Sequence, residues 1–223
     1  MTGWLEFIAA LAVFMLSHMI PVRPPARPWL IARLGVRGYF IGYSILSVAV
    51  LAWLIVAAAR APFVAVIPYH PVLIWVPLLA MPLACWLGVA GLAAVNPLSF
   101  GGLGRGEFDA DRPGVLGLTR HPLLLAMAVW AFAHMLANGD LAHVILFGLF
   151  VGFAAAGMAL IDLRRRRELG AEAWAALARN TARLSLRGLR HVRLSPPVLL
   201  AAAVVYALLL WLHPFVIGVS PLP

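Results

Sequence analysis

The sequence has no lysine and few acidic residues, so charged side chains make up only 11% of its 223 residues. A soluble domain of this length carries about 25% charged residues, whereas this chain is 64% hydrophobic. The composition therefore excludes an ordinary water-soluble domain. It predicts an all-α integral membrane protein, with one domain over residues 1–223 whose helices form a bundle.

Cysteine is nearly absent as well. The single cysteine, Cys85, lies within an apolar run, so it can form neither an internal disulfide bond nor a metal–thiolate cluster.

The N-terminus has no basic region before its first apolar stretch and no small-residue cleavage site. We therefore expect this stretch to be a retained first helix and not a signal peptide.

Six apolar stretches are each close to the roughly 20 residues that cross a bilayer as a helix, although the fourth is at the short limit. They are residues 3–21, 38–59, 71–95, 122–138, 141–162 and 196–217. Pro77 and Pro82 lie inside the third stretch, where they predict a kink or a break. Residues 168–190 carry apolar residues and arginines on separate stripes at helical spacing, which predicts an amphipathic helix at the membrane surface.

The arginines alternate along the chain. The connections 22–37, 97–121 and 163–195 hold four, three and nine arginines, while the connections 60–70 and 139–140 hold one and none. Because cytoplasmic loops are enriched in arginine, the first three connections should be cytoplasmic and both termini periplasmic in a bacterial inner membrane. We interpret the net charge of +9 as contact with anionic membrane lipids and expect no nucleic-acid partner.

The connection 97–118 is rich in glycine and contains the run GGLGRG. It lacks the Gly-Lys-Ser/Thr ending of a phosphate-binding loop and does not lie between a strand and a helix. We interpret it as a flexible loop able to cover a site at the cytoplasmic face.

Two of the seven histidines lie inside apolar stretches, His18 in the first and His134 in the fourth. An ionisable side chain is costly in the membrane and is therefore a candidate functional group. Neither has a carboxylate near it in the sequence, so each needs a ligand, a backbone carbonyl or a water molecule. Apart from His121, the other histidines need no special role, because they lie at stretch ends or in an arginine-rich connection. They are His70, His143, His191 and His213.

His121 lies between Arg120 and Pro122 at the start of the fourth stretch. A helix N-terminus beside a guanidinium suits an anion. The motif is equally well explained by a contact of Arg120 with a lipid phosphate and by proline as a common first helical residue. His121 and His134 are thirteen residues apart, which places them on roughly opposite faces of one helix. We do not expect them to share a pocket.

Three segments carry a resemblance to a known family. They are TRHPLLLAMAVWAFAHMLANGD at 119–140, SHMIPVRP in the first stretch and IDLRRRRELGAEAW after the fifth. Over roughly residues 1–190 the chain resembles the NnrU family of bacterial membrane proteins, which is associated with nitrite and nitric oxide respiration. That family includes the plant zeta-carotene isomerase, a haem b enzyme. It is distantly similar to the isoprenylcysteine carboxyl methyltransferases, which share an Arg-His-Pro motif.

The resemblance implies a haem b as cofactor, and the absence of a CxxCH motif makes any haem non-covalent. By the same resemblance His18 and His134 are the axial ligands of the iron. The pair of His18 with His121, which we expect at a common depth near the inner face, stays open as an alternative. Cationic groups at the inner face should hold the haem propionates. They are Arg23, Arg27 and Arg120, and His121 is a cofactor-binding candidate as the alternative ligand.

The implied function is a role in nitrogen-oxide respiration, or haem-dependent redox or isomerase chemistry on an apolar substrate that enters from the bilayer. One alternative is an S-adenosylmethionine-dependent membrane methyltransferase. The sequence fits it less well, because Leu-Leu-Leu follows the motif, and Asp162 and Glu168 are the candidate remnants of the acidic pattern. Another alternative is a non-enzymatic protein that handles haem or assists the assembly of a respiratory reductase, its expected partner.

Overall fold

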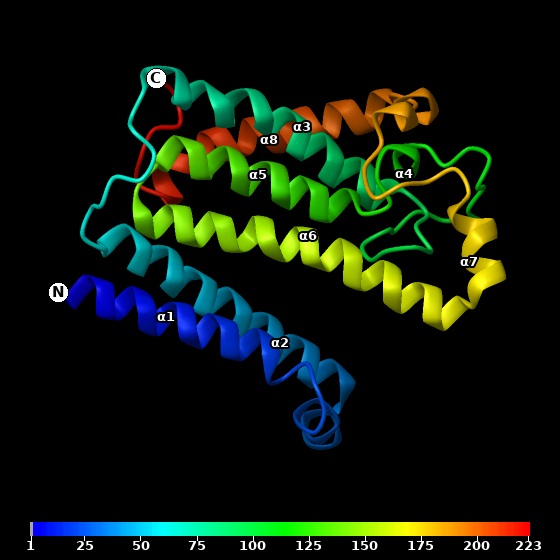
Figure 1. Ribbon diagram of the computed structural model, residues 1–223, viewed down its shortest axis with the longest axis horizontal. Helices are drawn as coiled ribbons and strands as arrows, with labels where there is room; N and C mark the ends of the chain where they lie inside the picture. Colours follow the sequence, from blue (N-terminus) through cyan, green and yellow to red (C-terminus); the bar gives the residue numbers. More distant parts are fainter. Residues whose placement is uncertain (1) are drawn as a thin grey trace. The chain divides into compact units, whose positions relative to one another are not determined.

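The computed structural model describes residues 2–223, and its regular structure is helical, with no β-strand among those residues (Figure 1). The described chain forms two compact units. The first contains the residues up to Ile67 together with Gly139–Leu146, and the second contains Pro68–Asn138 and Phe147–Pro223.

The first unit is built on helices α1 (Thr2–Met19) and α2 (Ala26–Arg60), which pack against each other. α1 buries Phe7 and Phe14, which are seven residues, or about two helical turns, apart and therefore lie on the same face of the helix. α2 is interrupted at Gly35, whose φ of 69° is not helical. Because glycine adopts positive φ without steric cost, the helix bends there, and its apolar part begins close to the predicted start at residue 38.

The second unit contains the other helices. In chain order they are the short 3-10 helix η1 (Pro71–Ile74), α3 (Trp75–Ala93), α4 (Val115–Leu118), α5 (Pro122–Asn138), α6 (Leu141–Leu169), α7 (Ala171–Ala178), the 3-10 helix η2 (Leu186–His191) and α8 (Pro196–Val216). The start of α6, up to Leu146, belongs to the first unit. α3 packs against both α5 and α8, and the Trp130 ring of α5 lies against Phe147 and Phe150 of α6.

Five of these helices are long and apolar enough to cross a membrane: α1, α2, η1 with α3, α6 and α8. α5 has 17 residues, which corresponds to about 25 Å. Ala202 is the buried residue of α8, so this helix presents apolar side chains outward on most of its surface. Apolar faces of this extent are stable in lipid and not in water. The all-α membrane bundle predicted from the sequence is confirmed.

The break expected in the third apolar stretch does not occur. α3 runs without interruption past Pro82, and Pro77 lies in its first turn. A proline in the first helical turn removes an N–H group that has no intrahelical partner there. The stretch begins instead with η1, which is capped by the His70 side chain.

The surface helix predicted over residues 168–190 is wrong in extent. α6 ends at Leu169, just before Gly170, whose φ is 82°, and after that glycine only α7 and η2 within that range are helical. The residues between them bind another segment by backbone hydrogen bonds. Arg120 N donates to Ala182 O (2.7 Å), and Ser185 N donates to Leu118 O (2.9 Å). These tertiary bonds replace the i to i−4 bonds that a continuous helix would need.

The glycine-rich connection after α3 is anchored to the second unit and does not form a free loop. Leu98 and Ser99 are buried, and the connection ends in α4, where Leu116 is fully buried. α4 packs on η2, so the connections before α5 and after α6 meet at one end of the unit (Figure 1). Two of the three arginine-rich connections are therefore brought together.

Candidate functional site

A buried carboxylate joins the start of α5 to the end of α6. The side chain of Asp162 is 6% exposed and forms a two-point ion pair with Arg120. Arg120 Nε donates to Oδ1 at 3.1 Å, and Nη2 donates to Oδ2 at 2.8 Å. This bidentate geometry is the strong form of a guanidinium–carboxylate contact.

Asp162 binds two further donors. Arg183 Nε donates to Oδ2 at 2.7 Å, and His121 Nε2 donates to Oδ1 at 3.0 Å. Each carboxylate oxygen thus accepts two hydrogen bonds, which satisfies a buried carboxylate. The cluster of Arg120, His121, Asp162 and Arg183, called the Asp162 cluster below, holds two guanidinium groups against one carboxylate.

The imidazole of His121 is held in one tautomer. Its side chain is fully buried, and Nδ1 accepts a hydrogen bond from Ser99 Oγ at 2.9 Å. Burial lowers the pKa of His121, and the attraction of Asp162 opposes this shift only in part. A neutral ring with hydrogen on Nε2 therefore fits both contacts, because the carboxylate can only accept.

Neighbouring polar side chains fix the backbone around this cluster. Asn96 Oδ1 accepts from the N–H of Ser99 at 3.0 Å, and Asn96 Nδ2 donates to Arg120 O at 2.9 Å. Thr119 Oγ1 donates to Arg183 O at 2.7 Å and accepts from the backbone N–H of His121 at 3.1 Å. Two separate segments of the second unit, residues 96–99 and the segment that contains Arg183, are thereby tied to the Arg-His-Pro motif.

His134 lies on α5, twelve residues after the first helical residue Pro122, which is about 18 Å along the axis. Its Nδ1–H donates to Trp130 O at 2.8 Å. Since a carbonyl oxygen can only accept, Nδ1 carries the hydrogen and Nε2 of the neutral ring keeps its lone pair. Aromatic rings of Trp130 and Phe147 lie near it, each at a centroid distance of 5.6 Å.

His18 repeats this geometry in the first unit. Its Nδ1–H donates to Phe14 O at 2.8 Å, one turn earlier on α1, so its Nε2 also keeps a lone pair. Its ring lies 4.2 Å from that of Phe14 and 6.1 Å from that of Tyr43. Arg23 and Arg27 of the same unit have exposed side chains.

A comparison with known protein families supplies an independent result. The family model of the NnrU protein matches residues 6–221. The chain belongs to the NnrU family. No curated protein and no solved structure shows significant similarity to it. The NnrU match extends past the roughly 190 residues of the predicted resemblance, and it includes α8 and both compact units.

In this NnrU chain the anion beside Arg120 and His121 is a carboxylate of the chain itself. The sequence predicts an anion at that position, either a haem propionate or a lipid phosphate. Both side chains are already bound to Asp162, and the expected propionate contact stays a prediction. The signal in the sequence was a lone acidic residue close to the end of a predicted span.

Ser99, Asn96 and Arg183 were not identified from the sequence. Ser99 and Asn96 lie in the glycine-rich connection, and Arg183 lies in the segment that was predicted to be helical. No local pattern marks them, because their partners are distant in the chain.

Within residues 2–223 no group of three or more histidine, cysteine or acidic side chains is placed to hold a metal ion, and a haem iron needs only axial ligands from the protein.

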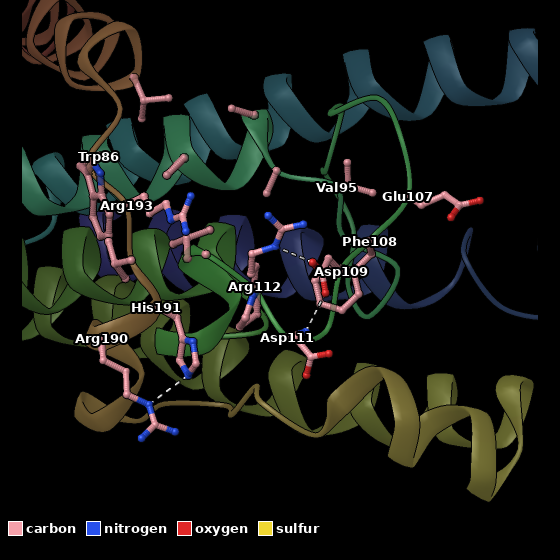
Figure 2. A pocket seen from close by; sticks show the side chains of 18 residues that line it. Trp86, Val95, Glu107, Phe108, Asp109, Asp111, Arg112, Arg190, His191 and Arg193 are labelled. Atoms are coloured by element: carbon pink, nitrogen blue, oxygen red, sulfur yellow. Dashed lines mark hydrogen bonds and ion pairs between the residues drawn. The ribbon is translucent and has the colours of Figure 1, made fainter.

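The arginine-rich end of the second unit also contains an open cleft of about 630 Å³ (Figure 2). Its walls come from the end of α3, from residues 107–115 and from residues 190–198. None of the Asp162 cluster side chains lines it. The cleft is thus a feature separate from both the Asp162 cluster and His134.

Proposed function

We propose that this NnrU protein binds haem b within the membrane, with His18 and His134 as axial ligands. The bound haem serves nitrogen-oxide respiration, or redox or isomerase chemistry on an apolar substrate from the bilayer. The observation that carries the proposal is the tautomer of His134, whose Nδ1–H is held by Trp130 O at 2.8 Å.

A hydrogen bond from Nδ1–H to a backbone carbonyl orients an imidazole and makes its Nε2 a better metal ligand. The same bond is present at His18, with Phe14 O as acceptor. Among the described residues no hydrogen bond to Nε2 of either ring is present. A membrane helix has no structural need of such a side chain, and iron ligation gives both rings a role.

The alternative ligand, His121, is less suitable. Both of its ring nitrogens are already bonded, Nδ1 to Ser99 and Nε2 to Asp162. A bond from Nε2 to iron would break the contact with Asp162 and leave part of a buried carboxylate unsatisfied. This supports His134 over His121 as the partner of His18.

A haem held in this way supplies a redox-active iron at membrane depth. The chain's own residues would orient the imidazoles of His18 and His134 for such a group, through their hydrogen bonds to Phe14 O and Trp130 O. The rings of Trp130 and Phe147 beside His134 exclude water from it. Arg23 and Arg27, which are exposed residues, are the cations available to the propionates.

The optical spectrum of the purified protein tests this proposal. We expect a b-type Soret band that is lost in both His18→Ala and His134→Ala and kept in His70→Ala, a control at the capped end of η1. His121→Gln should also keep the band. A protein whose spectrum does not shift when haem is added would contradict the proposal.

His213 is a further candidate ligand, because its ring has the same tautomer as those of His18 and His134. Its Nδ1–H donates to Val219 O at 2.8 Å at the end of α8. Loss of the Soret band in His213→Ala, with the band retained in His18→Ala, would assign the second axial position to His213. The assignment to His18 would then be wrong.

Turnover measurements separate the functional classes. Reaction of the reduced haem protein with nitric oxide or nitrite would support the respiratory role. Methyl transfer from labelled S-adenosylmethionine would instead establish the methyltransferase, although Arg120 and His121 are bound to Asp162 in this structure. Haem binding without turnover, together with co-purification of a reductase, would identify an accessory protein.

A further inference from the structure

The open cleft at the arginine-rich end of the second unit has walls of two kinds. Its inner wall is apolar and includes Trp86 and Ala90 of α3 and Val198 of α8. This wall is continuous with a buried core of Leu87, Ala90, Val115, Leu116 and Leu118, against which Trp86 and Val198 pack. The apolar wall is therefore backed by a tightly packed core, and its shape should persist in solution.

The outer wall of the cleft carries charged side chains. Asp109 is paired with Arg112 at 2.7 Å, and Asp111 is paired with Arg179. Arg190 and Arg193 are exposed, and none of the ion pairs within residues 2–223 includes either of them. Their side of the cleft is thus positively charged without an acidic partner.

Figure 2 shows how these groups are arranged. Arg190, His191 and Arg193 lie on one side of the cleft with Trp86, and Glu107 lies at the other side. Arg190 Nε donates to His191 Nε2 at 3.1 Å, a bond that uses only one of the five N–H donors of its guanidinium. The remaining donors can bind an anion.

The apolar wall continues onto a surface that faces lipid. α3 and α8 pack side by side and are both able to span a membrane. Near the cleft they expose large apolar side chains, among them Leu83 (47%) and Leu200 (68%). A ligand with a long hydrocarbon chain can therefore extend from the cleft along these helices, whereas a small polar ligand gains nothing from that surface.

We propose that this cleft binds an anionic amphiphile, with a phosphate group on Arg190 and Arg193 and an acyl chain against Trp86 and Val198. Charge complementarity selects the phosphate, because guanidinium groups bind phosphate oxygens through several N–H donors. Continuity of the apolar wall with the lipid-facing surface selects an acyl chain. The inference does not depend on the haem proposal, because the cleft contains neither His18 nor His134.

Native mass spectrometry of the full-length protein, with dioleoylphosphatidylglycerol as the probe, tests this inference. The double variant Arg190→Gln/Arg193→Gln should bind the lipid roughly 30-fold more weakly, since each arginine near a membrane surface contributes about 1 kcal/mol. Arg166→Gln/Arg167→Gln is the matched control, because it removes the same charge from exposed positions on α6 outside the cleft. It should keep the wild-type affinity.

A second variant tests the cavity without changing its charge. Ala93→Trp places a large side chain at an exposed position that lines the cleft, and it should also weaken lipid binding. Dioleoylphosphatidylcholine should bind more weakly than the anionic lipid of equal chain length. Equal losses in the two double variants, or wild-type binding by Ala93→Trp, would overturn the proposal.

Two soluble probes separate the amphiphile from other sources of the same chemistry. Inorganic phosphate and S-adenosylmethionine are each added in competition with the lipid. The amphiphile proposal predicts no displacement by either at concentrations comparable to the lipid. Displacement by phosphate would show that the acyl chain adds nothing, and displacement by S-adenosylmethionine would assign the cleft to that cofactor; each result would overturn the proposal.

Discussion

Arg120 and Asp162 are separated by 42 positions in the sequence and form a two-point ion pair, with N–O distances of 3.1 and 2.8 Å. The contact joins a residue two positions before α5 to the last turns of α6. Arg183 adds a second guanidinium at 2.7 Å. The Arg-His-Pro motif of this NnrU chain is therefore part of a buried internal clamp.

Replacing the carboxylate should destabilise the protein strongly. Asp162→Asn leaves Arg120 with a buried charge that has no carboxylate partner, and breaking a buried ion pair costs about 3–5 kcal/mol. The free energy of unfolding in mixed detergent micelles measures this loss. Glu168→Gln serves as the control, because Glu168 pairs with arginines at exposed positions of α6 and should change stability little. Similar losses in the two variants would contradict the clamp.

Stability should fall on acidification through His121. Burial lowers the pKa of His121 in the folded protein, whereas a histidine in an unfolded chain has a pKa of about 6.5. Below that pH the unfolded chain binds a proton that the folded chain does not. The contribution is therefore complete above about pH 6.5 and is lost, by at most about 1.4 kcal/mol per pH unit, as the pH falls toward the folded pKa.

The comparison of wild type with His121→Gln isolates this contribution, because the other titrating groups are common to both proteins. The free energy of unfolding should depend less on pH in the variant between about pH 7.5 and about pH 5.5. Parallel curves for the two proteins would show that His121 does not bind a proton on unfolding.

Asn96 should be important for stability, although it lies in a connection. Asn96→Ala leaves the carbonyl of Arg120 without its donor and the N–H of Ser99 without its acceptor, at a cost of about 1–3 kcal/mol for each buried group left unsatisfied. Asn96→Asp keeps the acceptor, so its stability should lie between those of the wild type and Asn96→Ala. Thermal unfolding in detergent measures both, and Asn138→Ala, at an exposed position, should be nearly neutral.

Gly188 should not tolerate a side chain. A Cβ atom there would overlap the carbonyl group of Gly117, where η2 packs on α4. Gly188→Ala should therefore cost at least about 1–3 kcal/mol, as overpacking does. Gly152→Ala in α6 is the matched control, because its Cβ would meet nothing within 4 Å, and alanine is the better helix former by about 1 kcal/mol. Equal stability of the two variants would contradict this packing.

The orientation in the membrane stays a prediction from the arginine distribution. Alkaline phosphatase fused after residue 223 should be active, since the C-terminus is expected in the periplasm. Fusions within the connections 97–121 and 163–195, which hold three and nine arginines, should be inactive. Activity of the fusions in these connections would reverse the assigned orientation.

Much of the fold was predictable from local signals. Three apolar stretches are predicted to begin at residues 71, 141 and 196, and in the structure the corresponding helices begin at Pro71, Leu141 and Pro196. A proline or a change to polar residues marks each of these starts. The amphipathic stripe over 168–190 misled, since its spacing is helical while its backbone bonds to another segment. Periodicity reports what a helix would bury and carries no information about a competing tertiary partner.

The candidate site likewise contains residues that could be identified from the sequence and residues that could not. His18 and His134 could be identified from the sequence because an ionisable group is costly in an apolar stretch wherever that stretch packs. Ser99 and Arg183 could not be, because their role depends on the positions of His121 and Asp162. Their residue types are ordinary in polar connections.

The amino-acid sequence was sufficient to predict a helical membrane protein, the positions of its apolar helices and the two histidines that lie within them. These properties follow from hydropathy and residue spacing, which act locally. The binding of Asp162 by Arg120 and His121, and the engagement of both nitrogens of His121, became visible only in the folded chain. A buried ion pair needs partners brought together from distant segments, and that proximity comes from the packing of the helices.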